Sequence, residues 1–272
     1  MQRSVLVTGA TSGIGFETAV EAARLGFHVV ATARSQEKAD DLRRAAKVRG
    51  ATLDTLVLDL HDPEAGSDEI PALDLWGLVN NAGYMNAGAV EDVPLADARQ
   101  QFEAMVFAPA RLAQLALPAM RRRGEGRIVN IGSVSSWTTG PMIGWYQATK
   151  HALKALNDAL RAEVEDHGTD VVLVEPGGFR TAIWPKARRE LEARREGSPY
   201  PAAYERALSI LDTLEPVMPS AEGVAKVVGE VLVAGRPRPR YRVGTDAFIL
   251  EAADAVLPAR LKDRAVKALL RL

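Results

Sequence analysis

Two residues with complementary acid–base chemistry lie four positions apart in the second half of the chain. Tyr146 and Lys150 fall in a stretch, residues 146–166, whose pattern predicts a helix, so their side chains share one face. An ammonium beside a phenol favours the phenolate and lowers a phenol pKa that starts near ~10. We therefore expect Tyr146 to act as an acid and base near neutral pH, with Ser133 placed to hydrogen-bond a substrate oxygen. Taken alone, the pair is also compatible with surface packing, and the serine with a simple turn.

A glycine-rich turn near the N-terminus has the spacing of an anion-binding site. Residues 8–15 read Thr-Gly-Ala-Thr-Ser-Gly-Ile-Gly, after an apolar run and before an amphipathic stretch, which predicts strand, turn and helix. Such a turn presents backbone N–H groups and a helix dipole to a phosphate. Gly9 suits a tight turn, Gly13 the close approach of a pyrophosphate, and Gly15 close packing of helix and strand. In this context nucleotide binding is favoured over a plain turn.

The elements that must position these residues alternate regularly along the chain. Apolar strands are expected near residues 5–7, 27–33, 51–58, 75–79, 127–131 and 170–174, with helices between them. The helical stretch 95–123 carries Pro109 and Pro118, which are expected to interrupt it. This alternation predicts an α/β fold with a three-layer, doubly wound parallel sheet of the Rossmann type, formed by residues 1–272 as a single domain.

Two segments near the C-terminus fall outside this alternation. Residues 184–214 form a mixed-charge, mostly helical insertion after the sixth strand, where ligands bind in such sheets, and we interpret it as a substrate lid. Its pair Glu190 and Arg194 is expected on a solvated face. A basic stretch before Tyr241 is interpreted as a loop entering an edge strand. The C-terminal extension, about residues 245–272, ends in an amphipathic helix that we expect to pack on the fold or on a second subunit.

Composition restricts the function classes further. The chain has 272 residues, a formal net charge of −1 and no cysteine. This charge gives no reason to expect a nucleic acid partner, and the lack of cysteine excludes disulfides and thiol nucleophiles. No apolar run approaches the ~20 residues of a membrane span, and no leader pattern is visible, so a cytoplasmic protein is expected.

Together these motifs resemble the short-chain dehydrogenase/reductase family across essentially the whole chain. The resemblance rests on residues 8–15, the Asn-Asn-Ala-Gly run 80–83, Ser133, and the Tyr-x-x-x-Lys pair, in that order. The features after residue 184 are most similar to the hydroxysteroid- and retinol-dehydrogenase branch. The resemblance implies an NAD(P)-dependent oxidoreductase that interconverts a carbonyl and an alcohol on a small molecule, without a metal, as a homodimer or homotetramer.

The family's residue roles transfer to matching positions of this chain. Tyr146 would exchange the proton with the substrate oxygen, Lys150 would lower the Tyr146 pKa and hold the nicotinamide ribose, and Ser133 would stabilise the developing oxyanion. Asp59 and Leu60 would border the adenine. The full set of implied cofactor contacts is Gly9, Thr11, Ser12, Gly13, Ile14, Gly15, Arg34, Asp59, Leu60, Asn80, Ala82, Gly83, Tyr146, Lys150, Pro176, Gly177 and Thr181.

One position departs from the family pattern. Met105 stands where the family has an asparagine that holds a water in a proton relay to the lysine. A thioether is a weak acceptor and no donor. The alternative to an enzyme is therefore a non-catalytic NADP(H)-binding sensor or partner protein. A serine hydrolase is disfavoured, because Ser133 does not lie in a Gly-x-Ser-x-Gly elbow.

The end of the second strand bears on the choice of cofactor. An acid there selects NAD, whereas a nearby arginine accommodates the 2′-phosphate of NADP. This chain has Arg34 and no acid, and Ser12 offers a further hydroxyl, so NADP(H) is expected, with NAD(H) as the less favoured alternative. A fairly apolar substrate is expected from Trp137, Met142, Trp145, Trp184 and the leucines of residues 184–214, which have core packing as their alternative role.

Overall fold

A parallel sheet of seven strands forms the centre of the computed structural model, which describes residues 2–62, 67–245, 247 and 258–270. The strand order is β3-β2-β1-β4-β5-β6-β7, so the predicted doubly wound sheet is confirmed. β7 lies at one edge, as expected for the segment around Tyr241. The strands are β1 (Ser4–Val7), β2 (His28–Ala33), β3 (Asp54–Val57), β4 (Gly77–Asn80), β5 (Gly126–Ile131), β6 (Thr169–Pro176) and β7 (Arg240–Val243).

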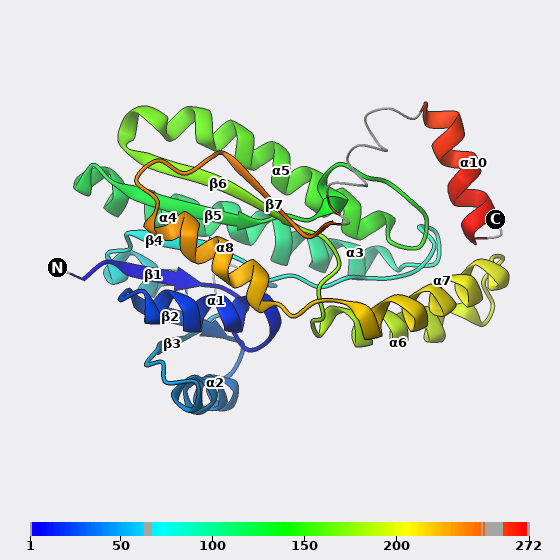
Figure 1. The fold of residues 1–272 in the computed structure, drawn as a ribbon, viewed down its shortest axis with the longest axis horizontal. Helices are drawn as coiled ribbons and strands as arrows, with labels where there is room; N and C mark the ends of the chain where they lie inside the picture. The colour runs from blue at the N-terminus through cyan, green and yellow to red at the C-terminus, as the bar shows by residue number, and fades with distance from the viewer. Residues whose placement is uncertain (1, 63–66, 246, 248–257, 271–272) are drawn as a thin grey trace.

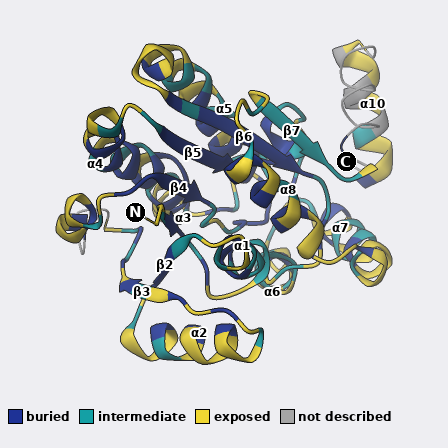
Figure 2. Cartoon of the chain, turned by 60° about the vertical axis from the view of Figure 1, so that its left-hand side comes forward, coloured by how far each residue is buried: buried dark blue, intermediate teal, exposed yellow. Residues whose placement is uncertain are grey.

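The inner strands are mostly apolar and buried along nearly their whole length, because helices cover both faces of the sheet. β4 and β5 are buried at every position (Figure 2). β1 pairs with β2 on one side and with β4 on the other, with Val7 opposite Ala31 and Val79. The direction of winding reverses between β1 and β4, so their carboxyl ends border a crevice at the topological switch point.

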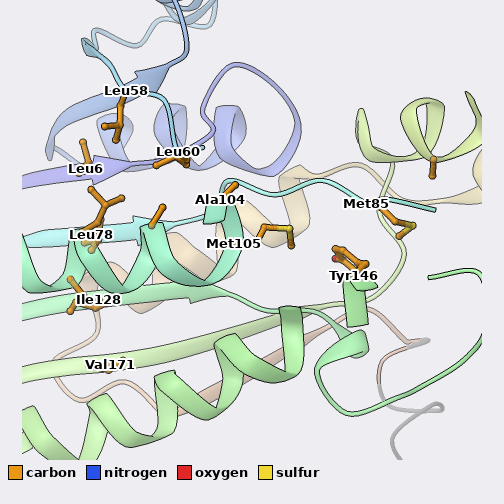
Figure 3. Close-up of a cluster of buried hydrophobic side chains, with 14 of the residues drawn as sticks. Leu6, Leu58, Leu60, Leu78, Met85, Ala104, Met105, Ile128, Tyr146 and Val171 are labelled. Carbon is orange, nitrogen blue, oxygen red and sulfur yellow. The ribbon is translucent and has the colours of Figure 1, made fainter. Parts of the chain in front are cut away.

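Helices flank both faces of the sheet (Figure 1), and a hydrophobic core lies between the sheet and each layer of helices. One core lies beneath α1 (Gly13–Arg24), α2 (Gln36–Val48) and α8 (Glu222–Val233). The other lies beneath α4 (Ala108–Arg123) and α5 (Gly144–Val164), and α3 (Leu95–Phe102) packs against α5. Figure 3 shows the second core running from Leu6 and Ile128 to Met85, Met105 and Tyr146, so the cluster extends from the sheet into the region of the predicted chemistry.

The expected interruption of residues 95–123 by proline is wrong in its location. The helical path continues through both prolines and is distorted instead at a single π-helical turn, η2 (Glu103–Phe107). Pro109 falls in the first turn of α4, where a missing N–H costs little, and Pro118 lies within α4 without ending it. Single π turns often occur at functional sites, and this one carries Met105.

The insertion after β6 is a helical hairpin of α6 (Ile183–Arg195) and α7 (Pro201–Leu214). Gly197 between them has a φ of 83°, a conformation that suits glycine. Figure 1 shows the hairpin at the end of the sheet toward which the strands point. The short helical turns are η1 (Ser67–Leu73), η3 (Val134–Ser136), η4 (Glu165–His167) and η5 (Glu215–Val217).

The C-terminal helix α10 (Ala259–Leu270) packs on α7, and Arg206 Nε donates a hydrogen bond to Leu269 O at 3.0 Å. The C-terminal extension predicted for about 245–272 falls partly outside the described residues, at 246, 248–257 and 271–272. Each helix of the described ranges is too short or too polar to cross a membrane.

Candidate active site

The structure brings Ser133, Tyr146 and Lys150 to the carboxyl end of β5. Ser133 follows this strand and caps η3, where its Oγ accepts a hydrogen bond from Ser135 N at 3.1 Å. Tyr146 and Lys150 lie one turn apart on α5 and are only 8% and 4% exposed. Lys150 Nζ donates to Ile131 O at 2.7 Å and lies 5.8 Å from the centre of the Tyr146 ring. The three polar ends therefore belong to one buried group.

Burial governs the ionisation of this group. It raises the pKa of Tyr146 to about 12, and a hydrogen bond with Ser133 lowers that pKa by less. Burial also lowers the pKa of Lys150 to about 8. The net shift of the Tyr146 pKa is therefore upward rather than downward, because the loss of water around the phenolate has the largest effect, and the effect of Lys150 stays a prediction. The neutral phenol is the form that can donate a proton.

Met105 lies against the same turn of α5. It is 1% exposed, and its Sδ is 3.9 Å from Thr149 Oγ1, whose hydroxyl also donates to Tyr146 O at 2.7 Å. A Cβ added to Gly83 would lie 3.3 Å from the Met105 methyl group. The thioether therefore fills the space between the end of the β4 loop and the helix that carries Tyr146, as Figure 3 shows.

A hydroxyl and an amide join the two strand ends at the switch point. Thr8 Oγ1 accepts hydrogen bonds from Asn81 N at 3.0 Å and Ala82 N at 3.1 Å, and donates to Val79 O at 3.3 Å. Asn81 Nδ2 donates to Thr8 O at 2.9 Å and to Gly9 O at 3.3 Å. These bonds fix the glycine turn after β1 against the loop after β4.

The glycine turn fits a dinucleotide phosphate. Gly9 and Gly13 have φ values of 64° and 56°, and a Cβ on Gly9 would lie 2.7 Å from Ala82 Cα. A Cβ on Gly15 would lie 2.3 Å from Gly9 O, so the three glycines are required by backbone geometry. Ser12 is the N-cap of α1 and makes no side-chain capping bond. The first N–H groups of the helix, with the exposed hydroxyls of Thr11 and Ser12, are therefore available to an anion.

The predicted adenosine contacts lie at the ends of β2 and β3. Arg34 follows β2 and is exposed, next to Ser35, the N-cap of α2. Asp59 accepts hydrogen bonds from both the backbone and the ring of His61, each at 3.0 Å. Mainly through the backbone bond, His61 lowers the pKa of Asp59, and Arg34 adds a smaller lowering. Leu60 is buried in the core beneath them.

The opposite end of the crevice is formed by the residues after β6. Pro176 ends this strand, and Gly177 N donates to Val243 O at 2.9 Å. The Thr181 side chain lies beside the glycine turn, since a Cβ on Gly13 would be 3.3 Å from Thr181 Cβ. The remaining predicted contacts lie between these two ends. They are Ile14, in the first turn of α1, and Ala82 and Gly83, in the loop after β4. The predicted contacts therefore lie at the carboxyl ends of the strands and on the segments that follow them, with one partial exception.

That exception is Asn80, whose buried side chain is hydrogen-bonded to other residues of the protein. Asn80 Nδ2 donates to Asn130 Oδ1 at 2.8 Å, and Asn130 Nδ2 donates to Asn157 Oδ1 at 3.0 Å. All three amides are buried. This row links β4, β5 and α5, so the side chain of Asn80 holds the three elements in register.

The hairpin of α6 and α7 is held against residues 84–92 by polar contacts. Glu190 Oε2 accepts a hydrogen bond from Ala87 N at 2.7 Å, and Arg194 donates to Ala87 O. Arg194 also pairs with Glu190 at 3.1 Å and with Asp97 at 3.0 Å. The predicted Glu190–Arg194 pair is present, but a solvated face is wrong, because these side chains are only 17% and 14% exposed.

Several residues of the site were not selected from the sequence as site residues. For Asn81, the Asn-Asn doublet at 80–81 is the sequence signal for its bonds to the glycine turn. Asn130 and Asn157 had no local signal, because they meet Asn80 only through the parallel sheet. His61 and Tyr84, whose Nε2 and Oη are 3.3 Å apart, are likewise joined only by neighbouring strand ends.

Comparisons with known proteins point to one family. The short chain dehydrogenase family model matches residues 3–192. The Escherichia coli (strain K12) oxidoreductase YbbO is 36% identical over 270 residues, which cover 97% of this chain and 94% of that protein. An NADPH-dependent 3-dehydrocapnine reductase of Ornithobacterium rhinotracheale is 32% identical and covers 96% and 95% of the two chains. A Sphingobium yanoikuyae short-chain dehydrogenase in complex with NADPH superposes with a TM-score of 0.72 at 26% identity, covering 97% and 95%.

Proposed function

Because the chain belongs to the short-chain dehydrogenase/reductase family, a family of oxidoreductases, we propose that it is an NADP(H)-dependent enzyme that interconverts a carbonyl and an alcohol. The observation that carries this proposal is the buried group of Ser133, Tyr146 and Lys150 beside the glycine crevice. A nicotinamide bound in the crevice supplies or accepts hydride at the substrate carbon.

The residues of the chain handle the proton and the developing charge. Neutral Tyr146 donates its proton to the carbonyl oxygen during reduction and takes it back during oxidation. Ser133 holds the substrate oxygen through its hydroxyl, and this bond strengthens as charge builds on that oxygen. The Lys150 ammonium stabilises the phenolate left on Tyr146, at short range in a site with little water.

Two features support the choice of NADP(H) as cofactor and of an apolar molecule as substrate. Arg34 lies exposed at the end of β2 with no acid beside it on that strand, which suits the 2′-phosphate of NADP. Tyr146 belongs to the same apolar cluster as Met142, Leu191 and Leu211, with Trp184 packed against it. This continuous apolar wall from the catalytic group into the lid supports a fairly apolar substrate. Trp145 lies elsewhere, next to Phe102 on the outer surface.

The test of the enzyme proposal is an assay of NADPH oxidation with a panel of apolar and polar aldehydes, ketones and quinones. Wild type is expected to reduce apolar members, and Tyr146→Phe, which keeps the ring but lacks the proton, is expected to lose at least about 10²-fold in kcat. NADPH binding without turnover above the Tyr146→Phe level would favour the sensor function, which the buried Met105 keeps as the second candidate.

The cofactor preference is tested at one residue. Wild type is expected to show a higher kcat/KM with NADPH than with NADH, and Arg34→Asp to reverse the order, because the new carboxylate repels the 2′-phosphate and accepts bonds from a free ribose hydroxyl. Equal use of both cofactors by wild type would refute the NADP assignment.

A further inference from the structure

A lysine on the lid reaches the cofactor side of the crevice. Lys186 lies near the start of α6, five residues after Thr181, whose side chain contacts the space beside Gly13 in the glycine turn. The lid therefore begins next to the place where the turn presents its N–H groups.

The surroundings of Lys186 are those of the adenosine side of the crevice. Its Nζ lies 3.6 Å from the centre of the Tyr84 ring, and Tyr84 Oη is 3.3 Å from His61 Nε2. His61 in turn contacts Asp59, at the end of β3. Burial lowers the pKa of Lys186, Glu190 raises it, and Arg34 lowers it by a smaller amount, so the two cations act on each other across the crevice.

The ion pair of Lys186 is the weakest of the contacts made by its partner. Glu190 accepts from Ala87 N at 2.7 Å and pairs with Arg194 at 3.1 Å, whereas Lys186 Nζ is 3.6 Å away. Ala87 N and Arg194 both contact Oε2 of this carboxylate, whereas Lys186 faces Oε1, so the pairing of Glu190 with Arg194 does not depend on Lys186. The ammonium can exchange Glu190 for a stronger acceptor without leaving a buried charge unpaired.

We propose that Lys186 is a phosphate ligand of the bound dinucleotide, supplied by the lid and acting with the glycine turn and Arg34. This inference rests on the proposed NADP(H) function. A charge-assisted hydrogen bond from Nζ to a phosphate oxygen replaces the long contact to Glu190. Because Lys186 is carried by α6, cofactor binding then holds the lid against the crevice.

The test measures binding without substrate. Dissociation constants for NADP⁺ and NAD⁺ are determined by titration calorimetry for wild type, Lys186→Met, Lys186→Gln and Lys186→Arg. The matched control is Arg189→Met, which removes a positive charge from an exposed position of the same helix. Lys186→Met and Lys186→Gln are expected to bind about tenfold more weakly, and Lys186→Arg and Arg189→Met within about threefold of wild type.

Each outcome has one meaning. Equal weakening for NADP⁺ and NAD⁺ assigns Lys186 to the pyrophosphate, and weakening for NADP⁺ alone assigns it to the 2′-phosphate. Unchanged affinity in both neutral variants, or equal weakening by Arg189→Met, overturns the role of Lys186 while leaving the proposed function intact. Failure of wild type to bind either nucleotide overturns both. Melting curves without nucleotide verify that the two neutral variants are folded.

Discussion

Lys150 is a buried ammonium whose charge has a specific task in the proposed chemistry. Burial disfavours both charged forms in this group, so it moves the pKa of Tyr146 upward and that of Lys150 downward. Tyr146 stays protonated over the whole neutral range and is ready to act as an acid. Lys150, in contrast, changes charge within a range where the enzyme can be assayed.

The rate of carbonyl reduction should follow the charge of Lys150. The ammonium predominates below its pKa of about 8 and is lost above it, so kcat/KM is expected to be level at lower pH and to fall as the pH rises through about 8. Rates at saturating NADPH from about pH 6 to about pH 10 measure this. A level profile across that range would show that the charge of Lys150 does not assist proton transfer.

Met105 allows a test of the position that departs from the family pattern. Met105→Asn is expected to leave kcat unchanged or raise it, because the amide can hold a water near Lys150. It is also expected to lower the free energy of unfolding by about 1–3 kcal/mol, since a polar group replaces a buried thioether. Steady-state assays and urea unfolding measure the two effects. A large loss of kcat with the fold intact would mean that the helix is aligned wrongly with the family.

At the scale of elements, the hairpin of α6 and α7, which we interpret as a lid, is held by contacts to the backbone in addition to apolar packing. Glu190 and Arg194 bind the N–H and C=O of Ala87, and Tyr204 Oη accepts from Ala89 N at 2.9 Å and donates to Asp92 at 2.7 Å. These contacts are largely shielded from water, since Glu190 and Arg194 are only 17% and 14% exposed and Tyr204 is buried, so each is expected to contribute to holding the hairpin in place.

Removal of Arg194 should loosen the lid selectively. Arg194→Ala leaves Ala87 O and Asp97 without this donor, and it is expected to cost about 1–2 kcal/mol of local stability. Hydrogen exchange at residues 84–92 and in α6 is then expected to speed up while the exchange of β4 and β5 stays constant. Arg195→Ala, on an exposed position of the same helix, is the control, and equal exchange in the two variants would contradict the prediction.

Helices and strands could be predicted from the sequence where apolar runs and turn residues determine them locally. The strands, the helix carrying Tyr146 and the break at Gly197 follow from apolar runs and turn residues. The π turn at Met105 did not, because residues 103–107 carry no local signal for it, and its contacts with α5 join segments far apart in the sequence. The site divides the same way: Ser133, Tyr146 and Lys150 were predictable by spacing, whereas the contacts of Asp59 with His61 and of Arg194 with Ala87 exist only after folding.

At the scale of the whole molecule, one outer face carries exposed apolar side chains. Leu95 is 58% exposed and Phe107 54%, and both line a surface cleft with Phe102 and Trp145. Exposed apolar groups that lie together often mark subunit contacts. We expect two copies to pair through this face of α3, η2 and α5, which would put a subunit contact directly behind the helix of the catalytic group.

The expected dimer can be tested with one substitution. Phe107→Asp places a charge in the centre of this face and is expected to shift the protein from dimer to monomer in light scattering. Val48→Asp, at an exposed apolar position on α2, is expected to leave the assembly unchanged. A monomeric wild type, or a dimer that survives Phe107→Asp, would rule out this face as the contact.

The bonds that join Thr8 and Asn81 have a consequence for protein engineering. One hydroxyl accepts two backbone N–H groups and one amide donates to two carbonyls, so the floor of the crevice tolerates few sequence changes. Variation that retunes the enzyme for another nucleotide is then confined to its rim, at the exposed end of β2 and on the lid. A mutant library built at these positions would sample nucleotide specificity while leaving the hydrogen bonds of Thr8 and Asn81 unchanged.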